Sequence, residues 1–397
     1  MDTKNKLLIV AGTAAMLSPL AAGGDYDLLR SYTLSQAAAE YKAINTHRSN
    51  IKVAIQLQTR YQINSRDDAS TALSSPDDDL TVGFVVRRAK VSFLGSVSDN
   101  IKGKLQIGFD RKTGATVLED AVFAWKMNDD LTLRIGQFKP GVMREEHVSS
   151  KRQLSAERSA TNKTFGQDYT QGMELGFGGG GWRATISLTD GFGADNTAID
   201  STSEADYGVS ARAEFLIADG EFGQFKQFTS FRGSSAGGMI GIAAYHESMG
   251  KTNLATIPTT GMTTATADFS WTDDGWNIFA AGIWRSMDAG TMRLDDYGIV
   301  LQGGMFVSDA DEVFARWSTV MPDSDNGAGS DGDYSDVTIG WNHFMIPESH
   351  AAKFTLAMTY SLDAVDASIV ETSEGHNLFA DSEDGQVGLI AQFQVLF

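Results

Sequence analysis

The sequence predicts an all-β fold, a transmembrane antiparallel β-barrel of about sixteen strands with short periplasmic turns and long external loops. Three observations favour this fold class. Segments that alternate apolar and polar residues recur along the chain, the connections between them alternate in length, and the last such segment, residues 386–397, has one apolar face. A period of two gives a strand with one apolar and one polar face. Strands in lipid must close into a barrel, because every backbone group has to be paired.

Composition and charge exclude several classes of protein. The 397 residues include no cysteine, so a disulfide framework and Cys-based zinc sites are excluded. The formal net charge of −19 disfavours a nucleic-acid partner, because such a chain offers no basic surface to release counterions. No cofactor or metal is expected: residues 323–333 resemble a calcium loop only loosely and are better interpreted as a solvated acidic loop.

The first fifty residues differ from the rest of the chain. Two lysines precede the apolar stretch 7–20 and small residues follow it, so residues 1–23 are predicted to form a signal peptide. The stretch is too short to span a bilayer comfortably, and a buried N-terminal helix is the alternative. Residues 24–50 look weakly helical and are expected to form a short periplasmic arm, which assigns residues 51–397 to the barrel.

The first segment, residues 51–64, shows the alternation most clearly. Its odd-numbered positions are mainly apolar, and its even-numbered positions carry lysine, glutamine and arginine. A helix would scatter both sets around its axis. Two later segments, 276–287 and 293–307, are weaker because both of their faces hold apolar residues. The predicted strands are 51–64, 82–98, 101–111, 117–127, 131–138, 170–178, 182–190, 207–217, 238–248, 263–271, 276–287, 293–307, 312–320, 334–344, 352–362 and 386–397.

Short and long connections between these strands alternate. The short ones therefore share one rim of the barrel and the long ones share the other, which is the outer-membrane pattern. Two connections break the rule: 112–116 is short where a long one is expected, and 218–237 is long where a short one is expected. With an even number of strands, both ends of the barrel lie at the short-turn rim, on the periplasmic side.

Tryptophan and tyrosine sort between the two rims. Five tryptophans adjoin predicted short turns, whereas five tyrosines lie toward the long loops. Most share the apolar face, as the two aromatic girdles of a membrane barrel do. A soluble β-sandwich with core tryptophans is the alternative, but it does not explain this sorting. The last strand is expected to pair with the first, because only closure abolishes the sheet edges.

Three stretches carry a resemblance to a known family. They are VVRRAKVSFLGSVSDNIKGKLQIGFD (85–110), LEDAVFAWKMNDDLTLRIGQFKPG (118–141) and SSKRQLSAERSATNKTFGQD (149–168), with an RRA pair, an LEDA start and an R-x-G-x-F-K-P exit. Together they resemble the phosphate-selective porin O and P family, and GEFGQFKQFTSF (220–231) is similar to a periplasmic connection of related porins. The resemblance implies a sixteen-stranded homotrimeric porin whose third external loop, here 139–169, folds into the lumen as a constriction.

The resemblance also implies a location and partners. A terminal aromatic residue such as Phe397 is typical of outer-membrane barrels, so we interpret it as a signal to the barrel-assembly machinery. The expected location is the outer membrane of a Gram-negative-type cell. The other expected partners are outer-membrane lipid and small anions or other small hydrophilic solutes.

Basic residues gather on the polar faces of the early strands and in the loop 139–169, which also holds Lys163. Neighbouring strands stand about 4.8 Å apart, so these side chains can form one wall. A basic wall raises the local anion concentration. The expected function is passive diffusion of small hydrophilic solutes, with a modest preference for anions such as phosphate. The predicted pore-lining and anion-binding residues are Arg60, Arg88, Lys90, Lys102, Lys104, Arg134, Lys139, Arg144, Lys151, Arg152, Arg158, Arg183 and Arg212.

Other interpretations stay open. In one, the basic residues merely hydrate the lumen and pair with Asp110, Asp120 and Glu214, while the acidic external loops repel anions. A non-selective or cation-preferring porin and a structural barrel without transport are therefore alternatives. An enzyme is not expected, because the six histidines are scattered along the chain. Aromatic residues prefer the apolar face, which argues against a sugar-specific porin.

Overall fold

The computed structural model describes residues 50–66, 79–110, 113–199, 205–248, 259–289, 292–325, 332–365, 375–379 and 384–397. The predicted signal peptide and all but the last residue of the predicted arm lie outside these described residues. Ile51–Phe397 forms one unit, which contains the barrel. Among the described residues, no helix is long and apolar enough to cross a membrane.

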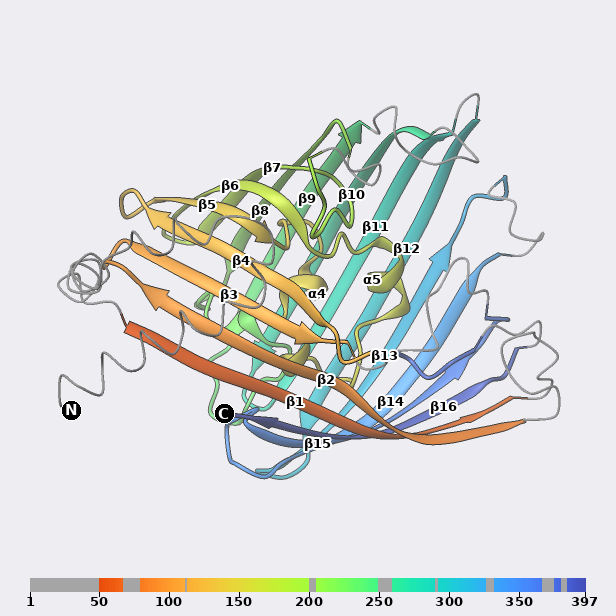
Figure 1. The fold of residues 1–397 in the computed structure, drawn as a ribbon. Coiled ribbons are helices and arrows are strands. Elements are labelled where there is room, and N and C mark those ends of the chain that lie inside the picture. The colour runs from red at the N-terminus through yellow and green to blue at the C-terminus, as the bar shows by residue number, and fades with distance from the viewer. Residues whose placement is uncertain are drawn as a thin grey trace, which may run out of the picture. The chain divides into compact units, whose positions relative to one another are not determined.

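Sixteen antiparallel strands within the described ranges close into a barrel (Figure 1). Each strand pairs with its neighbours along the chain, and the last strand returns to pair with the first. All sixteen predicted strands are confirmed, including the two weaker segments. The strands are β1 (Asn50–Ser65), β2 (Leu80–Ser96), β3 (Ile101–Phe109), β4 (Thr116–Lys126), β5 (Leu131–Phe138), β6 (Thr170–Gly179), β7 (Trp182–Thr189), β8 (Tyr207–Ile217), β9 (Gly237–Ser248), β10 (Thr259–Asp273), β11 (Trp276–Ala289), β12 (Met292–Phe306), β13 (Asp311–Met321), β14 (Tyr334–Phe344), β15 (Ala352–Ser361) and β16 (Val387–Leu396).

The seam between β1 and β16 is a continuous antiparallel ladder. Arg60 lies opposite Gln392 in its register. At the end of the seam, the Ile55 N–H donates to the Phe397 carbonyl oxygen at 2.5 Å, and the Phe397 N–H donates to the Ile55 carbonyl oxygen at 3.1 Å. The predicted closure is therefore confirmed, and it removes the two edges that an open sheet would expose.

The two faces of the barrel wall have opposite polarity. On β1 the outward Ile51 is 72% exposed, whereas the inward Gln58 and Asn64 are fully buried. On β2 the outward Phe84 is 87% exposed. A soluble protein keeps most large apolar side chains inside. An apolar exterior around a polar interior is instead the arrangement that lipid requires.

Strands β4 and β5 approach each other so closely at Gly136 that only glycine fits there. The φ angle of Gly136 is +128°, and a Cβ atom would lie 2.0 Å from the Ala121 carbonyl oxygen. An L-residue with a side chain would meet both backbone strain and a direct clash. This requirement accounts for the glycine in the R-x-G-x-F-K-P stretch.

The connection between β5 and β6 folds inside the barrel (Figure 1). It contains α4 (Arg144–His147), η1 (Ser150–Arg152) and α5 (Ala160–Phe165). The Ser159 hydroxyl caps α5 by accepting a hydrogen bond from the Asn162 N–H at 2.9 Å. The helix packs against β12 and β13, where Thr161 Oγ1 lies 3.1 Å from the Ile299 carbonyl oxygen and 2.9 Å from that of Thr319. The loop is thus fixed to the far wall of the barrel.

A second segment enters the barrel from the opposite, short-turn rim. It joins β8 to β9 and contains η2 (Gln224–Lys226). Its Phe228 is buried against Leu154 of the loop and Phe279 of β11. The Phe228 N–H also donates to the Arg152 carbonyl oxygen of the loop at 3.2 Å. The two segments therefore meet inside the barrel, which explains the connection that is too long for its rim.

Candidate functional site

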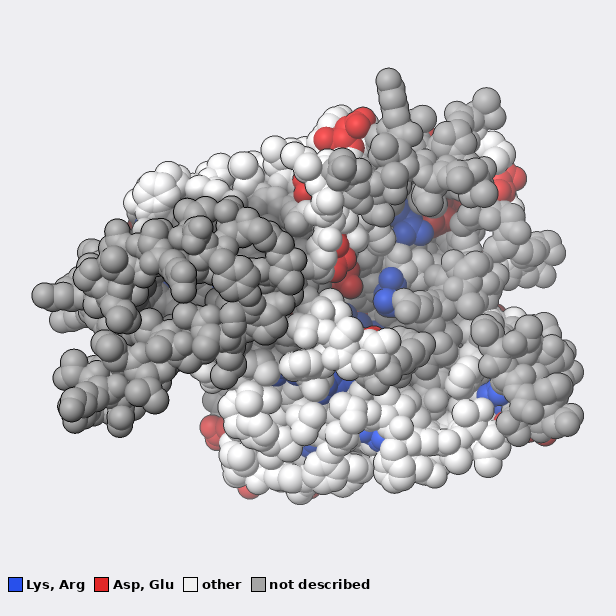
Figure 2. All heavy atoms as spheres, viewed as in Figure 1, with Lys and Arg blue, Asp and Glu red and all other residues white. Residues whose placement is uncertain are grey.

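A cavity of about 820 Å³ lies between the loop 139–169 and the wall formed by β1–β5. Figure 2 shows lysine and arginine residues recessed in a hollow of the molecule, with acidic residues near them. Eight cationic side chains and five carboxylates line the cavity, which leaves an excess of three positive charges. The cations are Arg87, Arg88, Lys90, Lys104, Arg134, Lys139, Arg158 and Lys163, and the carboxylates are Glu119, Asp120, Glu146, Glu157 and Asp168.

The cations in the middle of the wall have carboxylate partners on neighbouring strands. Lys104 Nζ on β3 lies 2.7 Å from an Asp120 oxygen on β4. Arg134 on β5 lies opposite Glu174 on β6, and their ion pair measures 2.7 Å. Partly exposed pairs of this kind contribute little to stability. They do neutralise charge locally, so this part of the wall agrees with the interpretation in which basic residues pair with carboxylates.

Lys90 on β2 reaches past β3 to a carboxylate on β4. Its Nζ lies 2.5 Å from a Glu119 oxygen. The residue opposite Lys90 on β3 is Gly108, and a Cβ atom there would lie 2.9 Å from Glu119 Oε1. The missing side chain therefore leaves the room in which Glu119 meets Lys90. The Tyr169 hydroxyl at the end of the loop lies 3.4 Å from the same carboxylate.

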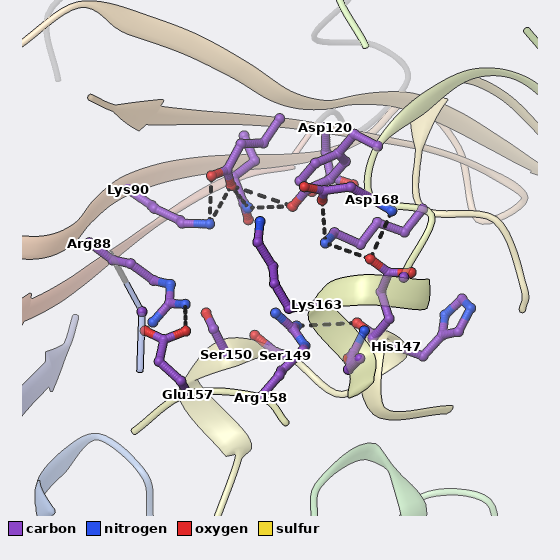
Figure 3. A pocket seen from close by; sticks show the side chains of 18 of the residues that line it. Arg88, Lys90, Asp120, His147, Ser149, Ser150, Glu157, Arg158, Lys163 and Asp168 are labelled. Atoms are coloured by element: carbon purple, nitrogen blue, oxygen red, sulfur yellow. Dashed lines mark hydrogen bonds and ion pairs between the residues drawn. The ribbon is translucent and has the colours of Figure 1, made fainter. Parts of the chain in front are cut away.

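One carboxylate, Glu157 of the loop, holds three guanidinium groups. Arg87 Nε and Arg88 Nη2 each lie 2.7 Å from a Glu157 oxygen, and Arg60 pairs with the same carboxylate. Figure 3 shows Arg88 and Glu157 facing each other at the cavity. Burial alone would raise the pKa of the Glu157 carboxyl, but the charges of Arg87, Arg88 and Arg60 hold this pKa well below its usual range. This arginine cluster has two more positive than negative charges.

Arg87 and Arg88 are consecutive in the chain, yet both reach Glu157. Side chains of a regular strand alternate between its two faces. Before the arginine pair, the exposed apolar side chains of β2 all lie at even positions, from Leu80 to Val86. After the pair, the even-numbered Lys90 and Ser92 instead contact Glu119 and Gln106 inside the barrel, and the exposed apolar residues are Phe93 and Leu94. The alternation therefore shifts by one residue at the pair, as at a β-bulge. Strict alternation assigns only Arg88 to the lumen, and Arg87 was missed for that reason.

Arg158 holds the backbone of the loop together. Its Nη2 donates to the carbonyl oxygens of Glu146 and Val148 at 3.2 and 2.8 Å, and its Nε donates to that of Glu145 at 3.1 Å. These acceptors are neutral, so the three hydrogen bonds do not cancel the positive charge of Arg158. Figure 3 shows Lys163 extending into the middle of the cavity. Lys163 belongs to the basic set of the loop but was absent from the predicted site.

The base of the loop is closed by a second group of contacts. Lys139 Nζ lies 2.6 Å from an Asp168 oxygen and 3.4 Å from a Glu146 oxygen. The Glu146 carboxylate also accepts hydrogen bonds from the N–H groups of Gln167 and Asp168, each at 2.9 Å. The start and the end of the loop are thus tied to each other.

The structure brings six of the thirteen predicted site residues to the cavity, namely Arg88, Lys90, Lys104, Arg134, Lys139 and Arg158. Lys102, Lys151 and Arg152 lie outside its lining. Lys102 is exposed, and the other two are partly buried.

The remaining four predicted residues also lie outside the lining of the cavity, and three of them, Arg60, Arg144 and Arg212, are buried. Arg60 is fully buried behind Glu157. Arg212 lies 2.8 Å from an Asp268 oxygen and 2.9 Å from a Glu214 oxygen, and Arg183 pairs with the same Glu214. The fourth, Arg144, is buried with its guanidinium carbon 5.5 Å from the centre of the Phe228 ring. Arg60 and Arg212 also donate to backbone carbonyl oxygens of the loop, those of Ala156 and Val142.

A sequence pattern typical of hydrolases occurs in the chain, but its structural setting differs from that of hydrolases. The stretch GSSAG (233–237) fits the G-x-S-x-G pattern of hydrolases, but it leads into β9 and does not connect a strand to a helix. Over the ranges that the structure describes, no group of three or more histidine, aspartate or glutamate side chains is suited to hold a metal ion.

The chain is similar to solved structures of outer-membrane proteins. The anion-selective porin from Comamonas acidovorans is 11% identical with a TM-score of 0.60, covering 88% of this chain and 100% of that chain. The in-vitro folded OmpT of Vibrio cholerae, in a trimer form, is 11% identical with a TM-score of 0.57, and the match covers 88% of this chain and 99% of that chain. The outer membrane channel DcaP of Acinetobacter baumannii is 10% identical with a TM-score of 0.58, and the match covers 87% of this chain and 97% of that chain. At these identities the likeness shows the fold alone.

The sequence itself identifies the family. No curated protein sequence matches the chain. A sequence model described as phosphate-selective porin O and P matches residues 55–378, which is most of the barrel. The expected resemblance is thus confirmed, and the chain belongs to the phosphate-selective porin O and P family, whose members are channels of the Gram-negative outer membrane.

Proposed function

We propose that this porin lets small hydrophilic solutes diffuse passively and prefers anions modestly, phosphate among them. The observation that carries the proposal is the excess of three positive charges around the cavity. A lumen with low-dielectric walls focuses such an excess and raises the local concentration of counter-ions. The preference is modest because the cations in the middle of the wall are paired with carboxylates.

The excess is concentrated where arginine predominates. The single carboxylate of Glu157 pairs with three guanidinium groups. The hydrogen bonds described above for the Arg158 side chain all go to neutral carbonyl oxygens. Arginine presents a planar fork of donors that matches two oxygens of an oxyanion. This geometry supports phosphate over a halide as the preferred anion of the site.

The reversal potential across a planar bilayer in a KCl gradient tests the proposal. Charge reversal of a cavity residue, Lys104→Glu or Arg134→Glu, is expected to shift the reversal potential toward cation selectivity. Lys126→Glu is the matched control, because Lys126 is half exposed at a turn outside the cavity lining and pairs with Asp129. A wild-type channel that clearly prefers cations would refute the anion preference but not the channel itself.

The neutralised pairs of the wall favour a second candidate, a porin without charge preference. In that case the wild-type reversal potential stays near zero, and charge reversal at Lys104 acts no more strongly than at Lys126. The same recordings therefore separate the two candidates.

We also propose a homotrimer, a cleaved signal peptide over residues 1–23 and a periplasmic arm over 24–50. The trimer is supported by the trimer form of OmpT, which shares the fold. Gel mobility of unheated against heated protein tests the trimer, and N-terminal sequencing of membrane-extracted protein tests the cleavage. Recognition of Phe397 by the barrel-assembly machinery predicts that its deletion lowers the amount of barrel in the outer membrane.

A further inference from the structure

Glu157 occupies the place that a small oxyanion would take in this channel. A carboxylate and a phosphate group present similar pairs of oxygens to an arginine fork. Three forks converge on Glu157, and two of them, those of Arg87 and Arg88, also line the cavity. The cluster is therefore a complete anion cradle that is filled by a side chain of the protein.

We propose that Glu157 is an internal competitor, whose carboxylate fills an arginine cradle for multivalent oxyanions and thereby determines the specificity of the channel. The proposal rests on the proposed anion preference and concerns the regulation of the same site. A phosphate dianion carries the charge and the paired oxygens that can replace the carboxylate. A chloride ion has one charge and no second contact atom, so it does not displace the Glu157 carboxylate and moves through the channel without binding to the three arginines.

The backbone of the loop also has anchors that do not involve the Glu157 carboxylate. Arg60 Nη2 donates to the Ala156 carbonyl oxygen at 2.8 Å. Arg316 Nη1 donates to the Glu157 carbonyl oxygen at 2.8 Å. Arg158 adds its three bonds to loop carbonyls. These hydrogen bonds hold the loop backbone independently of the carboxylate, so we expect the loop to keep its position when Glu157 is replaced.

Two variants separate the effect of the Glu157 carboxylate occupying the arginine cradle from the effect of the net charge of the cluster. Glu157→Gln removes the competing charge and leaves three arginines. The double variant Arg87→Gln/Glu157→Gln leaves Arg60 and Arg88, so its local charge equals that of the wild type while the competitor is gone. Glu214→Gln is the matched control, because Glu214 also binds two arginines but lies outside the cavity lining.

The experiment measures block of single-channel chloride current by added inorganic phosphate in planar bilayers. We expect Glu157→Gln to bind phosphate at least about tenfold more tightly than the wild type, which corresponds to one additional charge-assisted hydrogen bond to the anion. The double variant should also bind more tightly than the wild type, by about threefold or more. Glu214→Gln should stay within about twofold of the wild type.

Each outcome decides the proposal. Phosphate affinity in the double variant equal to that of the wild type means that only net charge matters, and it overturns the internal competitor. Unchanged affinity in Glu157→Gln overturns it as well, while a wild-type reversal potential on the anion side leaves the proposed function intact. The double variant restores the local charge balance, so it serves as the test if Glu157→Gln alone does not assemble.

Discussion

Truncation of Phe228 tests whether the two inserted segments support each other. The Phe228 ring is 3% exposed, lies 4.9 Å from the Phe279 ring and packs on Val148 and Leu154. Its face also contacts the buried guanidinium of Arg144. Phe228→Ala leaves a cavity at this junction and removes the contact of Arg144.

The expected loss of stability follows from the size of the deleted group. Truncation of a buried phenylalanine costs about 3–5 kcal/mol in well-packed interiors, of which the ring–ring contact accounts for about 0.5–1.5 kcal/mol. Phe228→Leu preserves more of the volume and is expected to cost about 1.5 kcal/mol or less. The loop loses its support from the short-turn rim in Phe228→Ala, so the mean single-channel conductance should rise and become noisier.

The measurement is urea-induced unfolding of the barrel in phospholipid vesicles, followed by fluorescence of the seven tryptophans and analysed by linear extrapolation. Single-channel recording of the same variants gives the conductance. A change in the free energy of unfolding below about 1 kcal/mol for Phe228→Ala would show that the junction is not a packed core. An unchanged conductance would show that the loop is held without it.

Two further predictions concern single positions. Gly136→Ala places a Cβ 2.0 Å from the Ala121 carbonyl oxygen, so it should lower the fraction of folded protein, measured as the heat-modifiable band on gels. Gly83→Ala is the control, because open space surrounds its Cβ and the folded fraction should not change. Burial, followed by the charge of Arg316, lowers the pKa of His376, whose Nε2 lies 2.5 Å from the Arg158 carbonyl oxygen. The folded chain therefore keeps His376 neutral while the unfolded chain takes up a proton below about pH 6.5, so stability is complete above that pH and falls below it. His376→Gln should reduce the drop in the urea midpoint between pH 7.5 and 5.5, and an equal drop in both proteins would contradict this origin.

The strands were predictable because lipid imposes a strict pattern on them. On β1 the outward and inward sets separate without ambiguity, and the predicted range 51–64 differs from Asn50–Ser65 by one residue at each end. The pattern weakened on β11 for a physical reason. Ile278 faces lipid, whereas its neighbour Phe279 is buried in the interior against Phe228. A wall that contacts lipid on one side and a packed insert on the other has two apolar faces.

The site was less predictable because its contacts join distant parts of the chain. Residue type and alternation selected Lys90 and Lys104, which line the cavity, but they could not reveal that Lys90 meets Glu119 across a glycine. A shift in the alternation of β2 hid Arg87, and only the folded loop brings Glu157 to it. Arg60 has the right parity and the right charge, yet the loop covers it completely.

The contacts of β1 with the loop have a consequence for assembly. Gln56 Nε2 lies 3.1 Å from the Ser150 hydroxyl, while Gln58 Nε2 donates to Gln394 Oε1 of β16 at 2.7 Å. The same short stretch of β1 therefore contacts both the loop inside the barrel and β16, the strand that closes the sheet. A misplaced loop would therefore remove a hydrogen bond from β1, one of the two strands of the seam. The position of the loop inside the barrel and the closure of the sheet are thus linked through one strand.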